Sequence, residues 1–139
     1  VAARVPLVFP IHPRTRARLE SFSLLGRAQA APGLHLIDPM SYIPFMGLVR
    51  HCGFVLTDSG GLQEETTYLG IPCLTLRPNT ERPITLTEGT NRLVETATLE
   101  AAVDEILGGT WHTGTKPALW DGQTAERVVL DLRRRTDTG

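Results

Sequence analysis

Short apolar runs alternate with amphipathic stretches along the whole chain. Strands are predicted for the apolar runs at 5–11, 34–37, 54–57, 72–76 and 92–94. Helices are predicted for the stretches with helical spacing at 14–25, 42–51, 62–69, 99–107 and within 121–135. The run at 54–57 is apolar on both sides, as strands buried in a parallel sheet are. The alternation predicts an α/β fold of Rossmann-like type, with helices on both faces of a parallel sheet.

Capping residues and glycines mark the ends of these helices. Pro13 suits the first position of a helix, and Ser41 and Thr98 suit the N-cap. Three helices are expected to end at glycines: Gly26, Gly53 and Gly70. The segments 77–83 and 108–121 are predicted to be irregular, and the last residues are expected to fray.

Composition and charge exclude several classes of function. The net charge of -1 gives no broad attraction to nucleic acid or to a membrane surface. No apolar run approaches the roughly 20 residues of a membrane span, and the first residues lack the apolar core of a signal peptide. Cys52 and Cys73 form no CxxC pair, and we expect two buried thiols in a reducing, cytoplasmic compartment. No metal-ligand cluster is present in the sequence, and no metal is expected.

Polar clusters follow the predicted strands at the points where the strands end: His12, 38–45, 58–65 and 77–82. Ligands of open parallel sheets bind outside the carboxyl ends of the strands. The most informative cluster is the turn Ser59-Gly60-Gly61 before a predicted helix. Glycines allow close approach of a ligand to the backbone, and the N–H groups of the helix start bind phosphate. An ordinary capped strand-to-helix turn explains the same residues equally well.

The neighbouring residues each allow two interpretations. One of Glu64 and Glu65 is expected to face the sheet end, where a carboxylate accepts hydrogen bonds from both hydroxyls of a ribose; stabilisation of the helix dipole is the alternative. Arg77 and Arg82 bracket a loop, and Arg82 suits a diphosphate as well as it suits solvent. Phe45 suits the border of a nucleobase or the core.

His12 follows a strand and precedes a helix start. It suits either donation to an anion and proton transfer or a structural role. The residues alone leave these alternatives open.

Taken together and in order, the motifs closely resemble the non-hydrolysing UDP-N-acetylglucosamine (UDP-GlcNAc) 2-epimerases. The resemblance rests on PIHP (10–13), IDP (37–39), YIPF (42–45), TDSGGLQEE (57–65), LGIP (69–72), Arg77 with TERP (80–83), and GTN (89–91). It covers nearly the whole chain. It implies the C-terminal half of a two-domain GT-B-type fold, with residues 1–139 as one UDP-sugar-binding domain and the N-terminal domain absent.

The resemblance also implies roles for single residues. Ser59, Gly60 and Gly61 would hold the diphosphate, Glu65 would bind the ribose hydroxyls, and Arg82 would contact phosphate. Phe45 would bind uracil through its backbone. His12 matches a residue that in some bacterial relatives is associated with a second, regulatory UDP-GlcNAc molecule.

The reaction implied by the resemblance interconverts UDP-GlcNAc and UDP-ManNAc. UDP is eliminated while the C2 proton is removed, the glycal is reprotonated on the other face, and UDP is added back, without a redox cofactor. The acid and base residues are expected in the missing domain, so we expect this chain alone to be inactive and its parent protein to be a homodimer. Three alternatives stay open: the nucleotide-binding domain of a GT-B glycosyltransferase, a hydrolysing epimerase, and a non-catalytic UDP-binding module.

Overall fold

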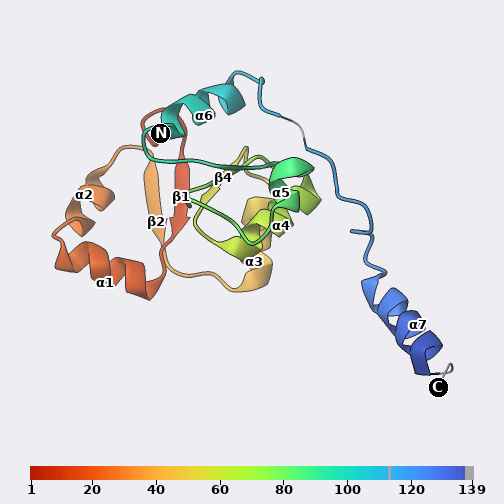
Figure 1. The fold of residues 1–139 in the computed structure, drawn as a ribbon. Helices are drawn as coiled ribbons and strands as arrows, with labels where there is room; N and C mark the ends of the chain where they lie inside the picture. Colours follow the sequence, from red (N-terminus) through yellow and green to blue (C-terminus); the bar gives the residue numbers. More distant parts are fainter. Residues whose placement is uncertain (113, 137–139) are drawn as a thin grey trace. The chain divides into compact units, whose positions relative to one another are not determined.

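The computed structural model describes residues 1–112 and 114–136. The chain divides into two compact units, residues 1–48 and 49–139, and each unit is described by itself. Figure 1 follows the chain from one terminus to the other. The expectation that the last residues fray falls partly on 137–139, which lie outside the described residues.

The first unit is built on two parallel strands, β1 (Leu7–Pro10) and β2 (Leu34–Ile37). Two helices connect them, α1 (Pro13–Ser21) and α2 (Leu25–Ala30), and Figure 1 shows both helices beside β2. The helix α3 (Tyr42–Val49) follows β2. This strand–helix–strand connection confirms the parallel pairing expected from the alternating pattern.

The predicted single helix at 14–25 is wrong, because two helices occupy this region. The first ends at Ser21, whose Oγ donates to the carbonyl oxygen of Arg18 at 2.9 Å. Two residues later Ser23 has φ 55°, in the left-handed region that a continuing helix does not use. Serine competes for backbone acceptors in this way, and the apolar spacing that continues beyond it concealed the break.

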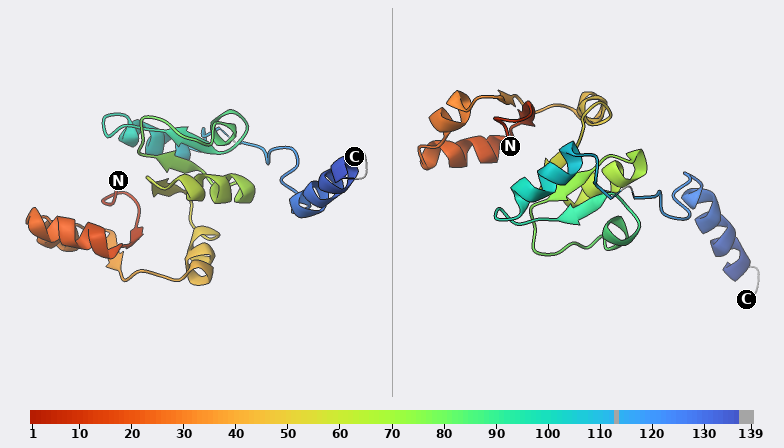
Figure 2. Two further views of the ribbon diagram at one scale, coloured as in Figure 1. Left: turned by 60° about the horizontal axis from the view of Figure 1, so that its bottom comes forward. Right: turned by 90° about the horizontal axis from the view of Figure 1, so that it is seen from above.

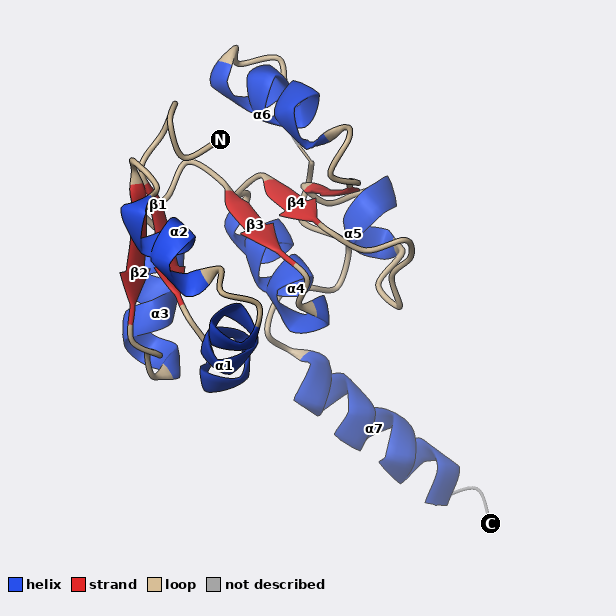
Figure 3. Cartoon of the chain, turned by 90° about the vertical axis from the view of Figure 1, so that its left-hand side faces the viewer, coloured by secondary structure: helices blue, strands red, loops and turns tan. Residues whose placement is uncertain are grey.

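The second unit contains a three-stranded parallel sheet in the order β3-β4-β5. Its strands are β3 (Val55–Thr57), β4 (Cys73–Thr75) and β5 (Asn91–Leu93). Its helices are α4 (Gly60–Leu69), α5 (Ile84–Thr87), α6 (Leu99–Leu107) and α7 (Thr124–Thr136). Figures 2 and 3 place α4 and α6 on opposite faces of this sheet. The short helix α5 was not predicted.

Side chains of β5 follow this two-faced arrangement. Asn91 is buried and its amide donates to Gln63 of α4, whereas the guanidinium of Arg92 donates to Glu105 of α6. Successive side chains of a strand point to opposite faces of the sheet. The predicted covering of both faces is therefore confirmed for this sheet.

The core of the second unit centres on β4. Cys73 and Leu74 are fully buried, as is Val103 of α6. Cys52 is only half-buried, so the expectation of buried thiols is confirmed for Cys73 and wrong for Cys52. Burial raises the pKa of both thiols, which keeps them protonated near neutral pH.

The α/β class with parallel strands is confirmed, and in the described residues the strands form two sheets rather than one. Gly70 has φ 71° and ends α4 as predicted. Thr98 precedes α6, but its hydroxyl does not cap the helix and instead bonds the backbone of Glu95. No helix in the described part of the chain is both long enough and apolar enough to cross a membrane. The assignment of residues 1–139 to a single domain stays a prediction.

Candidate functional site

The turn between β3 and α4 presents hydrogen-bond donors that have no partner among the described residues. Ser59 occupies the N-cap with φ -80° and ψ 132°, and its side chain makes no capping hydrogen bond. Its own N–H donates to Oγ1 of Thr57 at 3.0 Å. The N–H groups of the first helical turn, beginning with Gly60 and Gly61, have no partner within a helix. This turn therefore offers backbone donors and one hydroxyl to an anion.

The two glycines differ in what surrounds them. A Cβ added at Gly61 would meet nothing within 4 Å among the described residues. A Cβ added at Gly60 would lie 3.6 Å from Nη1 of Arg77 and 3.9 Å from Oε2 of Glu81. The start of the helix is thus open to a ligand at Gly61, whereas the side chains of Arg77 and Glu81 lie next to Gly60.

Arg77 follows the end of β4 and forms a two-pronged ion pair with Glu81. Its Nη1 and Nη2 donate to the two carboxylate oxygens at 3.2 and 3.0 Å. The pKa of Glu81 is lowered by a hydrogen bond from its own backbone N–H and by the Arg77 guanidinium. The Glu81 carboxylate is therefore ionised at neutral pH and offsets the arginine charge over the turn.

Arg82 is the second cation of this loop. Its Nε lies 3.0 Å from Oε2 of Glu64, and both side chains are a little over 40% exposed, at 43% and 42%. Its backbone N–H donates to Oγ1 of Thr80 at 3.0 Å. The ion pair shows that the loop 77–83 lies against the first turns of α4. The structure thus places Ser59, the two glycines and Arg82 in one polar region of the second unit.

The adjacent carboxylates of α4 have different surroundings. Glu64 is held by Arg82, whereas Glu65 has no hydrogen-bond or ion-pair partner among the described residues. Glu65 is half-buried in the same helix. Its carboxylate thus keeps its capacity to accept hydrogen bonds from a ligand. The ribose-binding role that the sequence resemblance implied for Glu65 stays a prediction.

His12 and Phe45 lie in the first unit, unlike the other predicted site residues. His12 is the N-cap of α1, and its Nδ1 accepts a hydrogen bond from the N–H of Arg14 at 3.2 Å. The N–H of Phe45 donates to the carbonyl oxygen of Ser41 at 3.1 Å. His12 therefore has a structural role in this structure. Contact of uracil with the N–H of Phe45 would require that helical bond to be shared.

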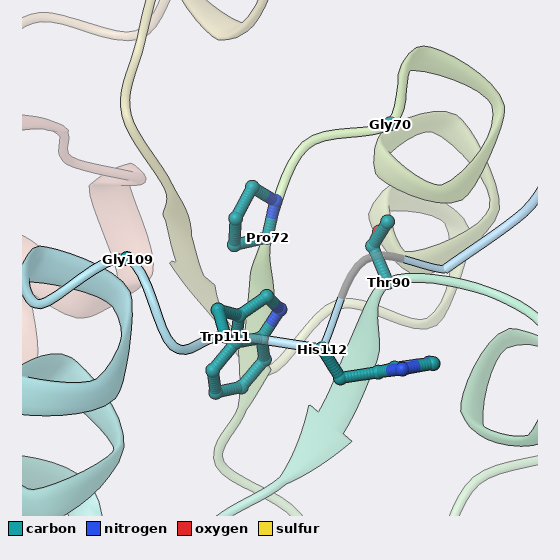
Figure 4. Close-up of a pocket in the computed structure, with 6 residues that line it drawn as sticks. All are labelled: Gly70, Pro72, Thr90, Gly109, Trp111 and His112. Atoms are coloured by element: carbon teal, nitrogen blue, oxygen red, sulfur yellow. The ribbon is translucent and has the colours of Figure 1, made fainter.

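A separate pocket of about 160 Å³ lies at the opposite end of the strands. Figure 4 shows its lining, with Trp111 and His112 beside Pro72 and Thr90. Pro72 and Thr90 precede β4 and β5, so this pocket lies at the amino ends of the strands. The guanidinium of Arg92 covers the Trp111 ring at 4.1 Å from its centroid. Because ligands of parallel sheets bind at the carboxyl ends, the Ser59 turn is the stronger candidate site.

Three residues that contribute to this region had no role predicted from the sequence: Arg77, Glu81 and Gln63. The pairing of Arg77 with Glu81 lies in a loop, where a spacing of four residues has no fixed geometry. A usable signal was the position of Arg77 directly after a strand, at the same sheet edge as the Ser59 turn. The fully buried side chain of Gln63 had no signal in the sequence.

Comparisons with known proteins agree on one family. The family model described as UDP-N-acetylglucosamine 2-epimerase matches residues 1–133. The UDP-N-acetylglucosamine 2-epimerase of Methanococcus maripaludis is 46% identical over 125 residues, covering 88% of this chain and 34% of the relative. That of Methanocaldococcus jannaschii is 39% identical over 128 residues, covering 91% of this chain and 34% of the relative. The chain therefore spans about a third of the length of the curated relatives that it matches.

A solved structure gives the same result for the fold. The crystal structure of the UDP-GlcNAc 2-epimerase of Methanocaldococcus jannaschii in complex with UDP-GlcNAc and UDP has a TM-score of 0.76 and 38% sequence identity. The match covers 91% of this chain and 35% of that one. The predicted GT-B-like architecture is thereby confirmed for the part that this chain represents. With a family model that matches nearly its whole length, the chain belongs to the UDP-N-acetylglucosamine 2-epimerase family.

Proposed function

We propose that this chain is the UDP-binding part of an enzyme that interconverts UDP-GlcNAc and UDP-ManNAc. The observation that carries the proposal is the uncapped start of α4 with Arg82 close to it, where Arg82 forms an ion pair with Glu64 of the same helix. Family membership and the ligands of the Methanocaldococcus jannaschii structure, UDP-GlcNAc and UDP, support UDP as the nucleotide. They favour the epimerase over the glycosyltransferase alternative raised from the sequence.

The proposed site divides the nucleotide among its residues. The hydroxyl of Ser59 and the N–H groups of Gly60 and Gly61 bind the diphosphate, and Arg82 neutralises part of its charge. The carboxylate of Glu65 accepts hydrogen bonds from the ribose hydroxyls. It is available for this role, since it lacks a partner among the described residues. The roles of Phe45, backbone contact with uracil, and of His12, a second nucleotide site, stay predictions separate from this site of the second unit. The last two roles rest on the sequence resemblance.

The contribution of this part to the reaction is electrostatic. When the bond between the sugar C1 and the phosphate oxygen breaks, negative charge grows on the diphosphate. Helix N–H groups and an arginine that are already oriented stabilise this charge without further reorganisation. The same contacts retain UDP while the glycal is reprotonated, so that UDP is available for re-addition.

The proton transfers are assigned to the portion of the relatives that these residues do not cover. We therefore propose that the 139 residues alone do not epimerise. Incubation with UDP-GlcNAc, followed by NMR of the anomeric protons, tests this, and formation of UDP-ManNAc above a protein-free control would refute it. The cytoplasmic location and the homodimeric parent stay predictions.

Calorimetric titration with UDP tests the binding site. Ser59→Ala and Arg82→Ala are each expected to weaken UDP binding by about tenfold, the loss of one charge-assisted hydrogen bond. Arg92→Ala is the matched control, since Arg92 is a similarly exposed arginine that pairs with Glu105 on the α6 face of the sheet. Unchanged affinity in both site variants would disprove the proposed site, and an equal loss in Arg82→Ala and Arg92→Ala would indicate that the effect of Arg82 is only a general effect of charge.

A further inference from the structure

A chain of hydrogen bonds links the Ser59 turn to Arg82 through a buried side chain. Gln63 is fully buried, and its Nε2 donates to the carbonyl oxygen of Ser59 at 3.3 Å. Its Oε1 accepts from the hydroxyl of Thr80 at 2.6 Å. The Thr80 oxygen in turn accepts from the backbone N–H of Arg82 at 3.0 Å. One amide thus connects the carbonyl at the N-cap with the backbone of the phosphate-binding arginine.

A second chain reaches Arg82 from the strand side. Nδ2 of Asn91 donates both to Oε1 of Gln63 at 3.0 Å and to Oγ1 of Thr85 at 3.2 Å. Thr85 donates to the carbonyl oxygen of Arg82 at 2.7 Å. Asn91 itself is fixed by the hydroxyl of Thr75, which donates to its Oδ1 at 2.6 Å. The N–H and the carbonyl oxygen of Arg82 are therefore both linked, through one threonine each, to the buried amides of Gln63 and Asn91.

This network has a feature that core packing alone does not require. Buried amides are costly unless each polar atom is satisfied, and an apolar side chain would fill the same volume without that cost. Gln63 instead uses its donor on α4 and its acceptor on the loop and on β5. Its two ends join elements that the sequence separates by up to 28 residues.

We propose that Gln63 is a positioning residue that fixes the loop carrying Arg82 against the Ser59 turn before any nucleotide binds. It touches no ligand and acts through Thr80 and Asn91. Resting on the function proposed above, this inference adds that affinity for the diphosphate depends on a pre-set distance between the turn and the arginine. Preorganisation of this kind lowers the ordering cost that binding otherwise carries.

NMR of the ligand-free chain tests the inference without UDP. In Gln63→Met the shape is kept and the amide is lost, and in Thr80→Val the hydroxyl is lost at a half-buried position outside the core. In both variants the heteronuclear NOE of residues 79–82 is expected to fall, and exchange of the Arg82 amide proton is expected to accelerate about tenfold. Thr80→Ser keeps the hydroxyl and is expected to behave as the wild type.

The control variant is Thr90→Val. Thr90 donates one buried hydrogen bond to the carbonyl of Ile71, at the opposite end of the strands from Arg82. This variant is expected to lose thermal stability while residues 79–82 keep the dynamics of the wild type. Unchanged dynamics of residues 79–82 in Thr80→Val would overturn the inference, even if Gln63→Met failed to fold.

UDP titration of the same variants separates this inference from the proposed function. If the wild type binds UDP, Gln63→Met and Thr80→Val are expected to bind about tenfold more weakly, and Thr90→Val as well as the wild type. A loop that loosens in both variants with no change in UDP affinity would overturn the inference and leave the proposed function standing. Absence of UDP binding by the wild type would contradict the proposed function, while the loop dynamics still decide whether Gln63 positions Arg82.

Discussion

Arg82 forms a 3.0 Å ion pair with Glu64, and this contact distinguishes Glu64 from the adjacent carboxylate, Glu65. Each arginine of the loop is paired with a glutamate, Arg82 with Glu64 and Arg77 with Glu81. The charges of the two loop arginines are therefore balanced by their glutamate partners in the absence of a ligand. An incoming diphosphate must compete with these carboxylates for the two guanidinium groups.

This competition predicts that removal of one carboxylate strengthens binding. Glu81→Gln is expected to raise the affinity for UDP about threefold at low salt, because it releases Arg77 and removes a negative charge near the phosphates. Glu81 is 63% exposed, so the gain should shrink as salt is raised. Calorimetry at two salt concentrations measures the effect, with Glu105→Gln as the control on the other face of the sheet. Weaker binding by Glu81→Gln would indicate that the carboxylate is needed to hold Arg77 in place.

The ribose contact is tested by comparing the two neighbouring glutamates. Glu65→Gln is expected to weaken UDP binding by about five- to tenfold, because a carboxylate accepts two hydroxyl hydrogen bonds better than an amide does. Glu64→Gln should leave the affinity unchanged or raise it, because Glu64 pairs with Arg82 rather than with the ligand. The opposite order in a titration would assign the ribose to Glu64.

Gly61 offers a test that separates binding from stability. A Cβ at this position meets nothing within 4 Å among the described residues, and Gly61 lacks a positive φ. Gly61→Ala is therefore expected to keep or raise the melting temperature, because alanine stabilises helices by up to about 1 kcal/mol relative to glycine. UDP binding is expected to fall about tenfold or more, because side chains of a helix lean toward its N-terminus, where the phosphate approaches. Undiminished affinity would place the phosphate elsewhere.

The local backbone structure of this site could be predicted from the sequence, because it depends on short stretches of adjacent residues. The turn at Ser59, the strand before it and the end of α4 at Gly70 depend on residues adjacent in the chain, whose backbone preferences are strong. The pairing of Arg77 with Glu81 and the buried amide of Gln63 depend on tertiary placement. A pattern of apolar positions also gave no sign of the break at Ser23 or of the short helix α5, because neither changes which positions are apolar.

The start of α7 is predicted to lose order in acid. Asp121 accepts hydrogen bonds from the side chain of Arg127 and from the N–H of Gln123, and the hydrogen bond from Arg127 is the main cause that lowers its pKa from 3.8 to about 2. Because the pKa is lower in the folded state, the ionised Asp121 carboxylate stabilises the folded state above pH 3.8. This stabilisation is lost as the pH falls toward 2. The amide shifts of residues 121–127 should therefore move between pH 4 and pH 2, and in Arg127→Met the midpoint should lie at higher pH. An unchanged midpoint in that variant would contradict the assignment to Arg127.

The central claim, that the diphosphate of UDP binds at the start of α4, is tested most directly by an NMR titration of the ¹⁵N-labelled chain with UDP. The largest amide shifts are expected at Gly60, Gly61 and Leu62, together with the side-chain Nε of Arg82, and they should saturate together. Inorganic diphosphate should shift the same amides, and uridine should not. Saturable shifts confined to the pocket around Trp111, or no shifts at millimolar UDP, would contradict the account.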